Sequence, residues 1–111
     1  MIGIDIVETN RFEKANPKMF NKVEIDYAFK HSDPHVHLAG FWAAKEAFFK
    51  AVGTGITSLS LDNIYVLHDE KQRPFLCVDE KIKRELNIVD KTIEISISHT
   101  KQNAVAICII K

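Results

Sequence analysis

One long helical run limits what this chain can fold into. Residues 34–52 contain no proline after Pro34 and a single glycine, Gly40, and most of the remaining residues are good helix formers. Asp33 and Pro34 form a helix start, with Asp33 as the N-cap and Pro34 at the first helical position. Gly53 is suited to end the helix in the left-handed conformation. We therefore expect a helix over residues 34–52 at the centre of the fold.

Strand patterns occupy both ends of the sequence. Residues 2–7 alternate so that Ile2, Ile4 and Ile6 share one face, and Asp5 lies on the other face with Gly3 and Val7. Alternation or a continuous apolar run predicts further strands over residues 59–67, 74–78, 92–99 and 104–110. This order of elements predicts an α+β fold in one domain over residues 1–111, a mainly antiparallel sheet with one long central helix and shorter helices.

Two shorter helical regions complete the expected fold. Residues 10–30 are polar and helical, with a break at Asn16-Pro17, and the second piece has an apolar stripe formed by Phe20, Val23, Ile25 and Tyr27. Residues 79–86 predict a short helix with Asp79 as its N-cap.

The overall charge excludes some classes of function. The chain has 15 Lys and Arg and 15 Asp and Glu residues, so its formal net charge at pH 7 is zero, which argues against nonspecific binding of nucleic acid. No apolar run approaches the roughly 20 residues that cross a bilayer. Cys77 and Cys108 lie inside apolar runs, where thiols behave as small buried hydrophobic residues, and no secretion signal is visible. We expect a cytoplasmic protein that binds neither nucleic acid nor a membrane.

Three charged residues are candidates for chemistry. Glu46 and Lys50 lie one helical turn apart, which is typical of a surface ion pair, but the apolar residues around them leave only a narrow polar strip that could line a cleft. Asp5 is either a solvent-facing residue of a one-sided sheet or a second carboxylate of that site. Asp5 and Glu46 together would suit Mg²⁺, which keeps several waters and bridges substrate phosphates.

The histidines allow several interpretations. Ser98 and His99 are adjacent on a strand and point to opposite faces, which argues against a Ser-His hydrolase. His99 is either a core histidine near a strand end or a donor to a phosphate. His31, His35 and His37 do not form a tetrahedral metal site, because His35 and His37 face different directions and no cysteine completes the set.

Two further segments could contact ligands or partners. Gly53-Thr54-Gly55 is either a simple helix end or a turn whose backbone N–H groups approach a ligand. Four basic residues within residues 10–22 face only one acidic residue, and they form either a solvated surface or a docking surface for an acidic partner: Arg11, Lys14, Lys18 and Lys22.

In combination, three motifs resemble one family. They are GIDIVE at residues 3–8, AAKEAFFKAVGTGI at residues 43–56 and SISHT at residues 96–100. The set is similar to the holo-acyl-carrier-protein synthases, small members of the 4′-phosphopantetheinyl transferase superfamily, and the resemblance spans almost the whole chain.

The resemblance implies a reaction. Members move the phosphopantetheine arm of coenzyme A to a serine of apo-acyl carrier protein, with Mg²⁺ as cofactor. Asp5 and Glu46 resemble the family's metal ligands, and Lys50 the lysine near the pyrophosphate; the base is either Glu46 or a water on the metal. Members are trimers with sites between subunits.

The resemblance also implies binding residues. His99, Lys50 and the segment Gly53-Thr54-Gly55 look like coenzyme A contacts, and Arg11 resembles a basic residue on the carrier side. The alternatives are a noncatalytic oligomeric module that binds coenzyme A or a nucleotide, and a purely structural oligomerisation domain.

Overall fold

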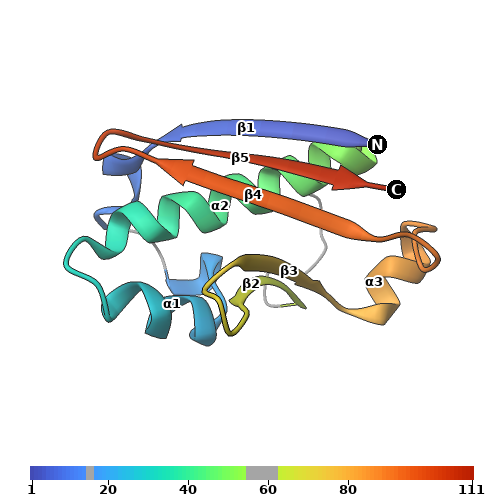
Figure 1. Cartoon of the computed structure of the whole chain (residues 1–111), viewed down its shortest axis with the longest axis horizontal. Coiled ribbons are helices and arrows are strands. Elements are labelled where there is room, and N and C mark those ends of the chain that lie inside the picture. Colours follow the sequence, from blue (N-terminus) through green and yellow to red (C-terminus); the bar gives the residue numbers. More distant parts are fainter. Residues whose placement is uncertain (15–16, 55–62) are drawn as a thin grey trace.

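The long helix runs where the sequence predicts it, from Pro34 to Val52, and is labelled α2 (Figure 1). The computed structural model describes residues 1–14, 17–54 and 63–111. In that part of the chain the other helices are α1 (Lys22–Phe29) and α3 (Glu80–Glu85), and short 3₁₀ turns form at Thr9–Phe12 and Pro17–Met19. The strands are β1 (Ile2–Glu8), β2 (Ile64–His68), β3 (Pro74–Val78), β4 (Ile93–His99) and β5 (Asn103–Ile110).

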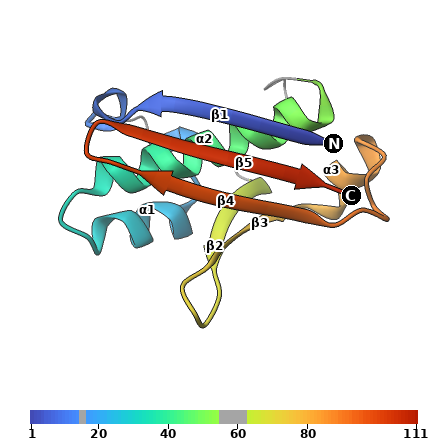
Figure 2. The ribbon, with the colours of Figure 1, turned by 45° about the horizontal axis from the view of Figure 1, so that its top comes forward.

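Helix α2 lies between two layers. Strands β1, β5 and β4 form a three-stranded sheet in that order and pack on one side of α2 (Figures 1 and 2). Helix α1 and the two-stranded β2–β3 sheet form the second layer, and α1 and β2 contact α2. Every strand pair is antiparallel. The predicted α+β fold with antiparallel strands and one long central helix is thus confirmed.

The ends of the helices follow local signals in the sequence. Gly53 has φ of 84° and its N–H donates to the carbonyl oxygen of Phe49 at 2.8 Å, which ends α2 as predicted. Asp33 occupies the N-cap position of α2, but its side chain makes no capping hydrogen bond. Asp79 caps α3 by accepting from the backbone N–H of Lys81. Of the strand predicted over residues 59–67, only the part from Ile64 onward is observed, since residues 59–62 lie outside the described residues.

The two faces of the large sheet differ in burial. Gly3, Asp5 and Val7 face α2, and a Cβ atom placed on Gly3 would lie only 2.0 Å from the carbonyl oxygen of Ala47. On the outer face the side chains of β1 are 59–67% exposed, and their partners on β5 are half-buried: Ile2, Ile4, Ile6, Val105, Ile107 and Ile109. We call these six residues the outer apolar face.

A buried ion pair joins α1 to α2. Lys45 Nζ lies 2.6 Å from Glu24 Oε1, and both side chains are fully buried. The second oxygen of Glu24 accepts from the backbone N–H of Val66 in β2 at 2.9 Å. The predicted apolar stripe is therefore partly wrong: Val23 is 45% exposed, and Glu24 with Ala28 forms the buried side of α1.

The cysteines and the helix lengths bear on where the chain is found. Both cysteines lie in the described part of the chain and are free thiols, with Cys108 buried and Cys77 half-buried. Burial raises the pKa of Cys108 to about 11, as expected for an unreactive core thiol. None of the helices within residues 1–14, 17–54 and 63–111 is both long enough and apolar enough to cross a bilayer.

Candidate active site

Asp5 and Lys50 meet between β1 and α2. Lys50 Nζ donates to Asp5 Oδ1 at 3.0 Å and to the carbonyl oxygen of Ile4 at 3.1 Å. The Asp5 side chain is only 13% exposed, so the interpretation of Asp5 as a solvent-facing residue is wrong. Lys50 is 53% exposed, and water screens the ion pair to about 0.2–1 kcal/mol. The pair therefore leaves the ammonium group accessible to a ligand.

Glu46 lies one turn before Lys50 on the same helix and belongs to the same site. Burial raises the pKa of Glu46, and the carboxylate of Asp5 raises it further. Lys50 and Arg11 act on the pKa of Glu46 in the opposite direction, which places Arg11 near this site as well. The sequence spacing alone is typical of an ion pair between Glu46 and Lys50, but the ion pair that Lys50 forms here is with Asp5.

The donor set of this site fits a hard divalent cation. Asp5 Oδ2 is buried and has no hydrogen-bond partner among the described residues. A buried carboxylate oxygen without a partner is costly, and two neighbouring carboxylates repel each other. A cation between Asp5 and Glu46 would relieve both penalties. Two carboxylates suit Mg²⁺, which also keeps several waters. Within residues 1–14, 17–54 and 63–111, no group of three or more His, Cys, Asp or Glu side chains is arranged to hold a metal ion.

The predicted coenzyme A contacts lie far apart in one chain. His99 ends β4, and its ring centroid lies 5.5 Å from that of His37, near the start of α2. Gly53 and Thr54 follow the other end of α2, roughly 24 Å along the helix from His37. His99 is exposed, so its interpretation as a core histidine is wrong. Gly55 lies outside the described residues.

The basic segment exposes its charged side chains, although Phe12 and Phe20 within it are buried. It begins at the first 3₁₀ turn and ends at the first residue of α1, and all four of its predicted docking side chains are exposed: Arg11, Lys14, Lys18 and Lys22. Arg11 connects this segment to the site through its effect on Glu46.

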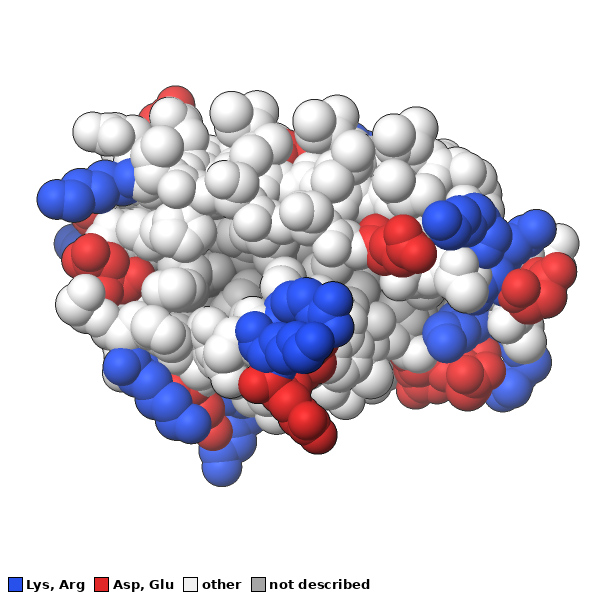
Figure 3. All heavy atoms as spheres, in the orientation of Figure 1, with Lys and Arg blue, Asp and Glu red and all other residues white. Residues whose placement is uncertain are grey.

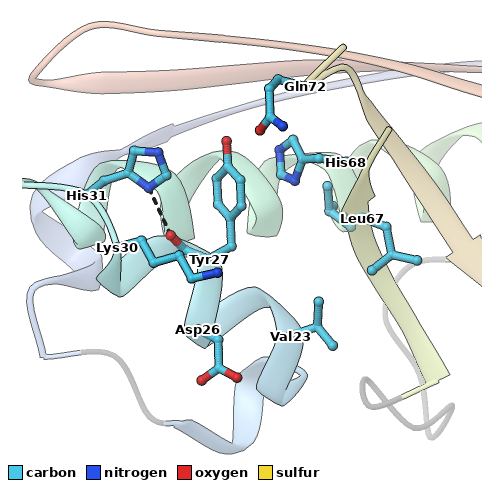
Figure 4. Close-up of a pocket in the computed structure, with 9 residues that line it drawn as sticks. Val23, Asp26, Tyr27, Lys30, His31, Leu67, His68 and Gln72 are labelled. Carbon is cyan, nitrogen blue, oxygen red and sulfur yellow. Dashed lines mark hydrogen bonds between the residues drawn. The ribbon is translucent and has the colours of Figure 1, made fainter. Parts of the chain in front are cut away.

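Some charged and aromatic residues were not identified from the sequence. Glu24 gave one usable signal: Asn21 and Glu24 have the spacing of a capping box, which the structure confirms. Lys45 gave another, since a lysine on an apolar helix surface needs a buried partner. No sequence signal links His68 to the other histidines, although it stacks on Tyr27 beside the cavity shown in Figure 4.

Comparison with known proteins identifies the family. The family model of the 4′-phosphopantetheinyl transferase superfamily matches residues 1–108. The holo-[acyl-carrier-protein] synthase of Thermoanaerobacter sp. (strain X514) is 40% identical over 119 aligned positions, which cover 97% of this chain and 84% of that protein.

Solved structures agree with the sequence relatives. The crystal structure of the Helicobacter pylori holo-[acyl-carrier-protein] synthase in complex with coenzyme A has a TM-score of 0.88 at 31% identity, and 100% of each chain is covered. The Bacillus anthracis synthase, in complex with CoA (3′,5′-ADP), has a TM-score of 0.81 at 35% identity, with 98% of this chain and 93% of that chain covered. Three sequence motifs, the fold and the residues matched therefore agree, and this chain belongs to the holo-[acyl-carrier-protein] synthases of the 4′-phosphopantetheinyl transferase superfamily.

Proposed function

We propose that this chain transfers the 4′-phosphopantetheine group of coenzyme A to a serine of apo-acyl carrier protein. The serine hydroxyl gives its proton to a base, either Glu46 or a water, and its oxygen forms a new bond to phosphorus. The bond from that phosphorus to the oxygen of the other phosphate breaks, and adenosine 3′,5′-bisphosphate leaves. One observation carries the proposal: in a chain of this family, Asp5 and Lys50 lie 3.0 Å apart and Glu46 lies close enough for Asp5 to raise its pKa. Phosphoryl transfer depends mainly on such positioning and charge neutralisation.

Asp5 and Glu46 are the residues that would hold Mg²⁺. The buried, unpaired Asp5 Oδ2 and the raised pKa of Glu46 support this assignment. When bound, the ion neutralises charge on the phosphates of coenzyme A. Both carboxylates sit on regular elements, β1 and α2, which keeps them in place before the substrate arrives.

Lys50 is proposed to act on the leaving phosphate. Its side chain is half exposed, and its ammonium group donates hydrogen bonds to Asp5 Oδ1 and to the carbonyl oxygen of Ile4. A cation fixed in this position stabilises the negative charge that develops as the phosphorus–oxygen bond breaks.

A homotrimer would complete the coenzyme A site. His99 and the segment Gly53-Thr54-Gly55 are proposed to contact coenzyme A from neighbouring subunits, because within one chain His99 and Gly53 lie near opposite ends of α2. The outer apolar face supports the assembly, since exposed isoleucines on β1 at 59–67% are typical of a surface that a partner covers.

The carrier protein is proposed to dock on the exposed basic segment. Its four basic side chains would steer an acidic partner and set its orientation: Arg11, Lys14, Lys18 and Lys22. Arg11 also lies near Glu46, so a carrier held there would bring its serine close to the carboxylates.

The two free thiols support a reducing compartment such as the cytoplasm.

A transfer assay tests the function. We expect purified chain, coenzyme A and Mg²⁺ to add roughly 340 Da, the mass of one phosphopantetheine group, to apo-acyl carrier protein. Asp5→Asn and Glu46→Gln should abolish the mass shift and weaken Mg²⁺ binding in isothermal titration calorimetry. Asp90→Asn, an exposed carboxylate between α3 and β4, serves as the matched control and should change neither result.

Two outcomes would contradict the proposal. Absence of any mass shift with every divalent ion tested would overturn the transferase activity. Coenzyme A binding that survives Glu46→Gln while the unmodified chain shows no turnover would instead identify a noncatalytic binding module.

A further inference from the structure

Three histidines lie around Tyr27, and a fourth, His99, lies beside one of them, His37. The ring centroids of His31 and His37 lie 4.2 Å apart, and those of His37 and His99 lie 5.5 Å apart. His68 stacks on Tyr27 with centroids 3.8 Å apart, and His31 lies 4.7 Å from the same tyrosine ring (Figure 4). We call His31, His37, His68 and His99 the histidine cluster. The proposed transfer reaction uses only His99.

Two members of the cluster, His37 and His68, resist positive charge in the absence of a ligand. Burial lowers the pKa of His37, and His31, His99 and His68 lower it further. Burial and His31 also lower the pKa of His68. Asp33 raises the pKa of His37, and Asp69 raises the pKa of His68. Since an unperturbed histidine titrates near pH 6.5, His37 and His68 are mostly neutral at pH 7.

A small cavity adjoins three of the four rings. It has a volume of about 180 Å³ and is lined by His31, His37 and His99 together with Thr100 and Lys101. One water occupies roughly 30 Å³ in the liquid, so a phosphate group fits this space. His31 also borders a larger cavity of about 620 Å³, in which Lys30 and His68 lie near Tyr27 (Figure 4).

Hydrogen-bond donors that suit an anion line these cavities. Several imidazoles and two lysines can donate hydrogen bonds there, whereas the described residues hold no group of three or more side chains suited to a metal ion. The acidic side chains that oppose an anion at the cluster or its two cavities are Asp26, Asp33 and Asp69. Protonated imidazoles this close together repel one another. A bound anion would attract each of them and so favour their protonated form.

We propose that the histidine cluster binds a phosphate ester between His31, His37 and His99 and takes up protons from solvent as it does so. Each imidazole that gains a proton forms a charge-assisted hydrogen bond to a phosphate oxygen. The phosphate belongs either to coenzyme A, a source that rests on the proposed function, or to a free phosphate compound. Affinity for the anion therefore rises as the pH falls.

Isothermal titration calorimetry with sulfate tests the proton linkage. Sulfate keeps its charge across the range, so any pH dependence comes from the protein. We expect sulfate affinity to rise about tenfold for each pH unit over which one proton is taken up, between about pH 8 and about pH 6. His37→Gln should reduce this dependence, as should His31→Gln at an exposed position where folding is not at risk.

His35→Gln is the matched control. His35 lies on α2 two residues before His37 but lines a different cavity, next to Glu8 and Glu13. It should keep the pH dependence of the unmodified chain. Equal sulfate affinity at both pH values in the unmodified chain would overturn the proposal, as would unchanged pH dependence in both His37→Gln and His31→Gln.

Three phosphate compounds identify the source. If coenzyme A shows the pH-dependent binding and 3′-dephospho-coenzyme A does not, the cluster holds a phosphate of the substrate. If sulfate and inorganic phosphate both show it and the two coenzymes behave alike, the cluster holds a free phosphate. Carrier modification together with pH-independent binding of every anion would overturn the cluster proposal and leave the transferase intact. Proton-linked sulfate binding in a chain that does not modify the carrier protein would support the cluster proposal and overturn the transferase activity.

Discussion

Gly3 sets the distance between β1 and α2 at the proposed metal site. A Cβ atom at this position would lie 2.0 Å from the carbonyl oxygen of Ala47 and 2.7 Å from the backbone nitrogen of Ala51. Both are backbone atoms, so no side-chain rotation can relieve the clash, and β1 would have to move together with Asp5. We expect Gly3→Ala to lower the free energy of unfolding by about 3 kcal/mol in urea denaturation at fixed chain concentration.

Gly40→Ala is the matched control for Gly3→Ala. Its Cβ atom would lie 2.9 Å from Ile97 Cγ2, a side-chain methyl group, whereas the close atoms at Gly3 belong to the backbone. Alanine also favours the helix by up to about 1 kcal/mol over glycine, so we expect a smaller loss of stability than for Gly3→Ala. Equal losses of stability in the two variants would show that the close contact at Gly3 is not the limiting one.

The buried ion pair between Glu24 and Lys45 holds three elements together. Lys45 is fixed on α2, Glu24 on α1, and Glu24 also accepts from Val66 in β2. Glu24→Gln leaves the ammonium group of Lys45 buried without its carboxylate, which typically costs about 3–5 kcal/mol of stability. We expect a loss of that size in urea denaturation, and we expect Glu24→Gln combined with Lys45→Met to recover part of it.

Asp26→Asn provides the control on the same helix. Asp26 is exposed, and changes at exposed positions usually alter stability by less than about 0.5 kcal/mol. If Glu24→Gln unfolded at the same urea concentration as Asp26→Asn, the pair would contribute nothing to the docking of α1.

Local signals predicted elements well and contacts between elements poorly. The bounds of α2 followed from Pro34 and Gly53, because helix ends are decided by residues within one turn. Alternation placed Asp5 opposite the isoleucines, but it could not tell which face of the sheet would be covered. The stripe on α1 was misjudged because the residue that pairs with Glu24 lies on another helix. The sequence groups His31 with His35 and His37, whereas the structure groups it with His37, His68 and His99. The reason is the same, since His68 and His99 come from two strands far along the chain.

At the scale of the whole molecule, zero net charge conceals an uneven distribution. Figure 3 shows that side chains other than Lys, Arg, Asp and Glu dominate the upper part of that view, where Figure 1 places the large sheet, and that many charged side chains lie along the lower edge and at both ends. Two copies of an uncharged surface do not repel each other electrostatically. The homotrimer proposed above would therefore form at the outer apolar face without separating ion pairs.

The outer apolar face provides the last prediction. Ile4 lies near its centre, is 59% exposed and pairs with Ile107 on β5. Ile4→Lys would bury an unpaired charge in the proposed trimer, whereas in a monomer the lysine would stay in water. We expect analytical ultracentrifugation to show a fall from three chains to one, together with loss of carrier modification, because His99 would no longer reach a neighbouring site. Val89→Lys, at a 52% exposed apolar residue away from the sheet, should change neither. An active monomer would contradict the shared site.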